Sequence, residues 1–152
     1  MTKYYKITKI KPELSDIRIL YYEVLMLNKT PITKTNDFVE NNMRIESFLL
    51  HARNLIDFLG DSGHLKCSEF KDSNGKKISK VEVVPNSITK EINEHLSHIS
   101  NRRRTRRISW NLPLLKKEIN KKVSEFLDKI SSNYFPSKEG LKRSDFDKII
   151  KN

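Results

Sequence analysis

The chain has 152 residues, of which 32% are charged and 36% are apolar, and its formal net charge is +11. This length fits one domain with its own core, and the periodic apolar positions exclude a disordered chain. The excess of Lys and Arg favours a polyanionic partner, nucleic acid first and an acidic protein or membrane surface second. A lysine-rich composition from an AT-rich genome also explains the scattered lysines.

Cysteine content and hydropathy exclude further classes of protein. Cys67 is the only cysteine, so no intrachain disulfide forms, and a reducing, cytoplasmic location is the simplest inference. A lone cysteine is typical of packing rather than of a nucleophile, because no His/Asn constellation lies near it in the sequence. We find no apolar signal-peptide region and no apolar run that could span a membrane, so we expect no membrane partner.

Apolar spacing predicts two helices in the first part of the chain. In residues 14–25, apolar side chains recur at the three- and four-residue spacing of an amphipathic helix. Residues 27–31 are predicted to end this helix. A longer helix is predicted over about residues 37–59, with Thr35 or Asn36 as its N-cap and Gly60 as its stop. Its predicted apolar face consists of Phe38, Met43, Ile45, Phe48, Leu49, Ala52, Leu55, Ile56 and Leu59.

The pattern breaks over residues 61–85, where turn residues gather and Lys80 to Val84 alternate weakly, as a short extended segment does. An irregular connection of this length is often functional. Further helices are predicted at about 86–100 and 112–133. Residues 136–152 are predicted to be a basic tail or to hold a short helix. The sequence therefore predicts one all-α domain over residues 1–152, with four main helices.

Two histidines on the third predicted helix have distinctive chemistry. His95 and His98 lie three residues apart, and we expect them on one face. Glu91 and Glu94, each four residues earlier, would orient the imidazoles for general acid/base chemistry. The alternative for His98 is a capping or packing role at the helix end. Zinc binding is the weaker interpretation, because neither an H-E-x-x-H motif nor a set of cysteines accompanies the pair.

Five arginines follow within nine residues of His98: Arg102, Arg103, Arg104, Arg106 and Arg107. Guanidinium groups bind phosphate and keep their charge, so this cluster is the predicted nucleic-acid-binding segment. Each phosphate that it neutralises would make binding more sensitive to salt. Trp110 follows closely, and a ring near arginines can stack on a base, although such a tryptophan more often anchors a helix in the core.

A secondary cleft is predicted on the second helix. At about 100° per residue, Arg44, His51 and Asn54 fall in one polar band beside the apolar face. One interpretation is a satisfied polar network at the edge of the bundle, with Glu40 and Arg44 as an i,i+4 pair. The other is that His51 and Asn54 line a cleft that faces the third helix.

Two segments, Ile45 to Leu59 and Ile92 to His98, resemble a group of small bacterial all-helical proteins that look like distant relatives of the HEPN superfamily. The HEPN signature is an arginine, usually followed by a polar residue, with a histidine four to six positions further on. Here the closest match ends at His98 and has Asn93 in the place of the arginine. Arg44 and His51 also satisfy the bare spacing, but on another helix.

The resemblance implies a HEPN-like helical bundle that is commonly dimeric and engages RNA. Many HEPN proteins are metal-independent ribonucleases of toxin–antitoxin, phage-defence and CRISPR systems, and others only bind nucleotides or RNA. The implied site consists of His98 as general acid or base, Asn93 to position the phosphate, and His95, with no cofactor and no metal. The resemblance therefore implies a homodimer and a candidate endoribonuclease.

The missing arginine leaves alternatives open. Asparagine lacks the charge that would stabilise a developing negative charge on the scissile phosphate. Arg102, Arg103 or Arg44 would then take that role, or the site binds without cleaving. The alternatives are a non-catalytic RNA- or nucleotide-binding protein, an antitoxin-like partner, and an adaptor whose arginines dock on an acidic protein surface.

Overall fold

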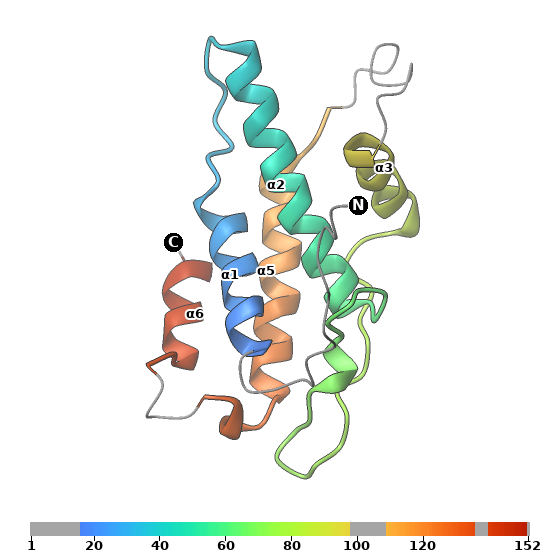
Figure 1. Ribbon diagram of the computed structural model, residues 1–152, viewed down its shortest axis with the longest axis vertical. Coiled ribbons are helices and arrows are strands. Elements are labelled where there is room, and N and C mark those ends of the chain that lie inside the picture. The colour runs from blue at the N-terminus through green and yellow to red at the C-terminus, as the bar shows by residue number, and fades with distance from the viewer. Residues whose placement is uncertain (1–15, 98–108, 136–139, 152) are drawn as a thin grey trace, which may run out of the picture.

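The structure is a computed structural model that describes residues 16–97, 109–135 and 140–151. The described residues form α1 (Asp16–Lys29), α2 (Phe38–Leu59), α3 (Asn86–Ser97), α5 (Leu112–Lys129) and α6 (Arg143–Ile150), with two short 3-10 helices and no strand. α1, α2 and α5 pack against one another, α6 lies against α1, and α3 lies against α2 on the other side (Figure 1). The all-α prediction is confirmed at this level.

The core lies where α1, α2 and α5 meet, and its residues recur at helical spacing. Leu20, Val24 and Leu27 of α1 are buried against α2 and α5. Local signals set the helix ends. Asp37, rather than the expected Thr35 or Asn36, caps α2, because its Oδ1 accepts a hydrogen bond from the Glu40 amide at 3.0 Å. Gly60 ends α2 as predicted.

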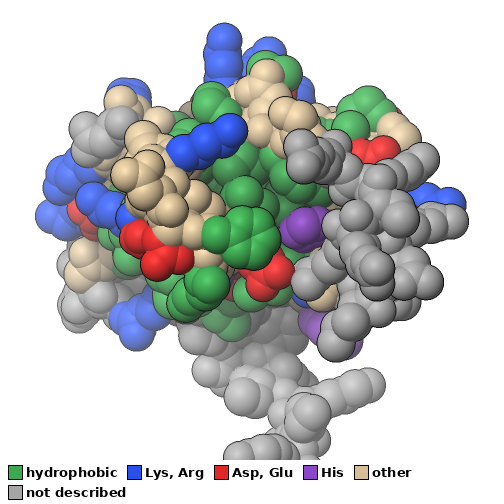
Figure 2. Space-filling model, turned by 90° about the horizontal axis from the view of Figure 1, so that it is seen from above, with side chains coloured by type: hydrophobic (Ala, Val, Ile, Leu, Met, Phe, Trp, Pro, Cys, Tyr) green, Lys and Arg blue, Asp and Glu red, His purple; other side chains and the backbone are tan. Residues whose placement is uncertain are grey.

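The apolar face predicted for α2 is correct only from its middle onward. Phe38 is 78% exposed and Met43 is 66% exposed, because the first turns of α2 extend beyond the ends of α1 and α5 (Figure 1). Seen from above, apolar side chains gather on this end of the molecule, with Lys and Arg around its margin (Figure 2). Periodicity marks a helical face but does not show where its packing partner ends.

The segment that follows α2 is anchored to the core. Phe70 and Ile78 are buried, and the Phe70 ring lies edge-on to Phe58 and Phe126 with centroids 5.8 and 5.3 Å away. The Val81 amide donates a hydrogen bond to the Leu59 carbonyl at 2.8 Å. Lys80 to Val84 form no strand; in the described segment the only bridge joins Lys71 and Lys77.

The C-terminal segment is a packed helix rather than a basic tail. Phe146 of α6 is fully buried, and its ring lies edge-on to Tyr21 of α1 at 5.1 Å. Arg143 forms ion pairs with Asp128 of α5 and Asp147 of α6. α6 thus closes the bundle beside α1. Among the helices that the structure describes, none is both long and apolar enough to cross a membrane.

Candidate functional site

A cleft of about 520 Å³ lies between α1, α2, α3 and the turn after α2. Its volume falls within the range of about 300–1,000 Å³ that is usual for ligand sites. Apolar walls are supplied by Ile19, Leu20, Leu55, Phe58 and Leu65. Its polar side chains come from every surrounding element: Glu23 from α1, Arg53, Asn54 and Asp57 from α2, His64 from the turn, and Asn93 from α3. We call it the α1–α2–α3 cleft.

Two side chains of α2 hold Glu23 at the wall of this cleft. His51 Nδ1 lies 2.7 Å from Glu23 Oε2, and Asn54 Nδ2 donates to the same oxygen at 3.1 Å. A carboxylate oxygen accepts the hydrogen bond, so this contact requires the His51 tautomer with its proton on Nδ1. His51 is 6% exposed, and Tyr22 lies edge-on to its ring with centroids 5.9 Å apart. This network fixes the rotamers of Glu23 and Asn54.

The two interpretations of the polar band on α2, as a satisfied network and as the wall of a cleft, each describe part of it. His51 belongs to a satisfied network at the edge of the core, as the structural interpretation expects. Asn54 lines a cleft together with Asn93 of α3, as the functional interpretation expects. The carboxylate that joins the two residues, Glu23, lies on α1.

The charges of the α1–α2–α3 cleft are mixed. Glu23 and Asp57 bring carboxylates, and Arg53 brings the guanidinium. Asp57 also supports the turn beside the cleft, because its Oδ1 accepts a hydrogen bond from Ser62 Oγ at 3.1 Å. Two carboxylates repel an entering phosphate, whereas amide and carboxylate oxygens accept hydrogen bonds from neutral polar groups. The described cleft thus suits a base or a sugar better than a bare phosphate.

α3 presents its two described candidate residues to different neighbours. Asn93 lines the cleft, whereas the His95 ring lies edge-on to Trp110 with centroids 5.8 Å apart. Residues two positions apart on a helix are rotated by about 200° about its axis. The Asn93 and His95 side chains therefore point away from each other. Trp110 packs against the core, as the sequence favours. His98 and the arginines Arg102, Arg103, Arg104, Arg106 and Arg107 lie outside the described residues.

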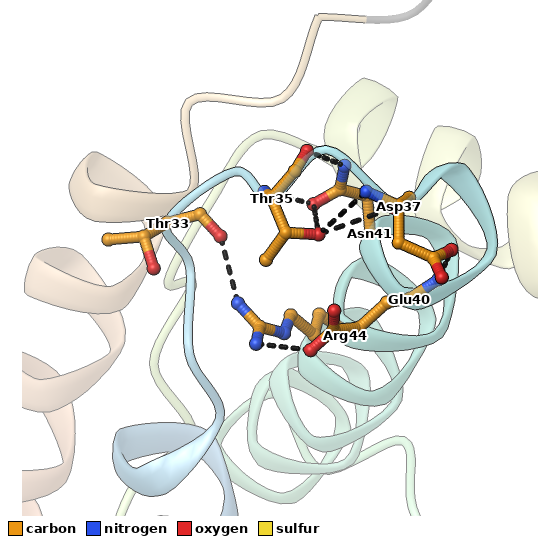
Figure 3. Close-up of polar contacts among 6 residues, drawn as sticks. All are labelled: Thr33, Thr35, Asp37, Glu40, Asn41 and Arg44. Carbon is orange, nitrogen blue, oxygen red and sulfur yellow. Dashed lines mark hydrogen bonds and ion pairs between the residues drawn. The ribbon is translucent and has the colours of Figure 1, made fainter.

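Arg44 lies apart from the other two residues of the predicted secondary cleft. Its guanidinium donates to the Thr33 carbonyl at 3.1 Å and forms the expected ion pair with Glu40 (Figure 3). It lines a separate pocket, near Trp110. Arg44 lies two helical turns before His51, about 10 Å along α2. Asn54 thus lines the α1–α2–α3 cleft, Arg44 lines the other pocket, and His51 is buried and lines neither of them.

Cys67 is a packing residue, as expected. It is 1% exposed, and its Sγ lies 3.3 Å from the Leu59 carbonyl oxygen and 3.4 Å from Asp61 Oδ1. Burial, together with the hydrogen bond to Asp61, raises the pKa of the thiol to about 12. A thiol with this pKa stays protonated near neutral pH, so it is a poor nucleophile.

Three cleft residues have no strong local signal in the sequence. Glu23 lies on α1, where the apolar periodicity draws attention to its neighbours, and its partner His51 comes 28 residues later. Arg53 falls outside the polar band of α2, and His64 lies in an irregular turn. Only the packing of α1 and the turn against α2 brings them together.

Within residues 16–97, 109–135 and 140–151, no three His, Cys, Asp or Glu side chains are grouped as a metal site requires. No protein-family model, curated protein or solved structure matches the chain. A functional assignment therefore depends on the residues of the chain itself.

Proposed function

We propose that the chain is a HEPN-like RNA-binding protein that holds a nucleotide of single-stranded RNA in the α1–α2–α3 cleft. One observation carries the proposal, the convergence of Asn54 and Asn93 with Glu23 on one cleft. Amide side chains both donate and accept, which matches the edges of splayed-out bases. His51 and Asn54 use two of about four acceptor positions of the Glu23 carboxylate, so others are left for a ribose hydroxyl.

Phosphate binding is assigned to Arg53 in the cleft and to the predicted arginine cluster, which lies outside the described residues. The net charge of +11 attracts a polyanion over distance, and Arg53 supplies a guanidinium at the cleft itself. Arg102, the first arginine of the predicted cluster, follows the last residue of α3, Ser97, by five positions. Two paired copies, as the HEPN resemblance implies, would double these groups.

Metal-independent cleavage is the catalytic form of this proposal. The 2′-oxygen of a ribose would attack the adjacent phosphorus, and the bond to the 5′-oxygen of the next nucleotide would break. His98 would take the 2′-proton while water protonates the leaving oxygen, or it would protonate the leaving oxygen while water takes the 2′-proton. Asn93 would position the phosphate, and Arg102 and Arg103 would stabilise its charge. Such a reaction would continue in EDTA.

Binding without cleavage is the second candidate function, and the described part of the cleft favours it. Asn93 carries no charge, and Glu23 and Asp57 would oppose the extra negative charge of a phosphorane-like transition state. An RNA-binding or antitoxin-like protein needs hydrogen bonds to base and ribose, which the cleft offers. An adaptor for an acidic protein would leave the cleft unused.

Binding of labelled single-stranded RNA is expected to weaken about 100-fold between 50 and 200 mM salt. The reason is counterion release: about five phosphates neutralised by arginine give a slope near −3.5 in log affinity against log salt for a single strand. Fluorescence anisotropy measures the affinity at each salt concentration. Equal affinity at both concentrations would contradict the phosphate contacts and favour the adaptor.

Wild type and His98→Ala, incubated with RNA in EDTA, separate the two forms of the proposal. Cleavage by wild type alone identifies the catalytic form with His98 in its site. Salt-sensitive binding without cleavage by either protein identifies the non-catalytic form. Equal cleavage by both proteins would exclude His98 as the catalyst.

A further inference from the structure

A second pocket, of about 390 Å³, lies between residues 31–34, the first half of α2 and the start of α5. It shares no lining residue with the α1–α2–α3 cleft. Its apolar walls are formed by Pro31, Ile32, Ile45, Trp110, Leu112 and Pro113. We call it the Trp110 pocket. Neither its position nor its composition is explained by the proposed RNA site.

Positive side chains stand at the edge of the Trp110 pocket. Lys34 and Arg44 both line it, and none of its described lining residues is acidic. Arg44 makes two contacts of its own, with the carbonyl of Thr33, which also lines the pocket, and with Glu40, which does not (Figure 3). A guanidinium has five N–H donors, so these contacts orient the group and leave further donors for a ligand. Lys34 and Arg44 contribute two positive charges and Glu40 contributes one negative charge, so the formal charge of these three residues is +1.

The wall opposite α5 is fixed before any ligand arrives. Asn41 of α2 accepts from the Thr35 amide at 2.8 Å and donates to the Thr35 carbonyl at 2.7 Å (Figure 3). Thr30 Oγ1 donates to the Met26 carbonyl at 2.7 Å and ties the start of the same segment to α1. A pocket that is already formed loses less conformational entropy when it binds.

We propose that the Trp110 pocket binds a nucleotide, with its base against Trp110 and the aliphatic walls and its phosphate at Arg44 and Lys34. An apolar space lined by an indole favours an aromatic ring. A guanidinium and an ammonium group that line the same pocket favour an anionic substituent on that ring. An aliphatic ligand would not use the indole, and an uncharged ring would not use the two cations. The proposal does not depend on the α1–α2–α3 cleft.

Trp110 itself reports on this pocket, because it is the only tryptophan of the chain. Adding AMP to the full chain is expected to quench its fluorescence in a saturable way. Ribose 5-phosphate lacks the ring and is expected to leave the fluorescence unchanged. Adenosine lacks the phosphate and is expected to bind at least tenfold more weakly.

Charge-removing variants connect the fluorescence change to the pocket edge. Lys34→Gln removes an exposed lysine and is expected to weaken AMP binding about fivefold. Arg44→Gln is expected to weaken it at least tenfold, with circular dichroism to confirm that the variant folds. Lys117→Gln, on the exposed surface of α5 and outside the pocket, is the matched control and should bind as wild type does.

A 5′-phosphorylated RNA oligonucleotide distinguishes the two sources of a nucleotide. Quenching by AMP that Lys34→Gln weakens supports a free nucleotide as the ligand. Quenching by the oligonucleotide alone, again weakened in Lys34→Gln, supports a nucleotide of RNA. The proposal is overturned if neither compound quenches at millimolar concentration, or if Lys34→Gln binds like Lys117→Gln. Salt-sensitive RNA binding, with no change at Trp110 on adding either AMP or the oligonucleotide, would overturn this proposal and leave the cleft proposal standing.

Discussion

Replacing Phe146 with alanine is expected to lower the free energy of unfolding by about 3–5 kcal/mol. The Phe146 ring is fully buried and lies edge-on to Tyr21 at 5.1 Å and to Phe135 at 6.1 Å. Its removal leaves a cavity between α6 and α1 that the surrounding side chains cannot fill. Urea unfolding, followed by far-UV circular dichroism, measures the change.

Phe38→Ala is the matched control for this variant. Phe38 is 78% exposed at the start of α2, so its removal should change the free energy of unfolding by less than about 0.5 kcal/mol. Equal small effects at Phe38 and Phe146 would mean that α6 does not pack against the bundle. The C-terminal segment would then be the basic tail that the sequence also allows.

Removing the Glu23 carboxylate is expected to have the second largest effect. Glu23→Ala should destabilise the fold by about 2–3 kcal/mol, because it leaves His51 Nδ1 and Asn54 Nδ2 without their acceptor at the edge of the core. In a double-mutant cycle with His51→Ala, we expect a coupling energy of about 1–2 kcal/mol. Urea unfolding of the four proteins gives this value.

The ion pair of Glu40 and Arg44 on α2 provides a control cycle. This pair is the more exposed of the two, with side-chain exposures of 47% for Glu40 and 24% for Arg44 against 18% for Glu23 and 8% for His51. Exposed i,i+4 pairs couple by about 0.3–0.5 kcal/mol. If the Glu23–His51 cycle gave no more than this control, the network could not be what fixes Glu23 and Asn54 at the cleft.

Much of the fold follows from the sequence because it depends on local patterns. The apolar spacing of α1, α2 and α5 and the stop at Gly60 are features of short segments, and the structure reproduces them. Pro113 lies in the first turn of α5, where a proline is favoured because its missing N–H would have no partner within the helix. Exposure of Phe38 depends instead on where the neighbouring helices end, which no local pattern records.

The candidate site follows from the sequence only in part. The polar band of α2 identifies Asn54, and the HEPN resemblance identifies Asn93, but neither shows that the two residues share a cleft. Glu23 binds His51 and Asn54 across α1 and α2, and such a contact becomes visible only when the helices are packed. Asn93 and His95 lie only two residues apart in the sequence, yet the helical geometry of α3 directs them to different neighbours.

The side-chain amide signals of the asparagines in an NMR spectrum test the central claim most directly. On titration with a short single-stranded RNA, we predict that the signals of Asn54 and Asn93 shift. Those of Asn28 and Asn120 should stay in place, because these two side chains hydrogen-bond each other between α1 and α5, at 3.0 and 2.8 Å. RNA binding that leaves both the Asn54 and the Asn93 signals unchanged would contradict a nucleotide site in the α1–α2–α3 cleft.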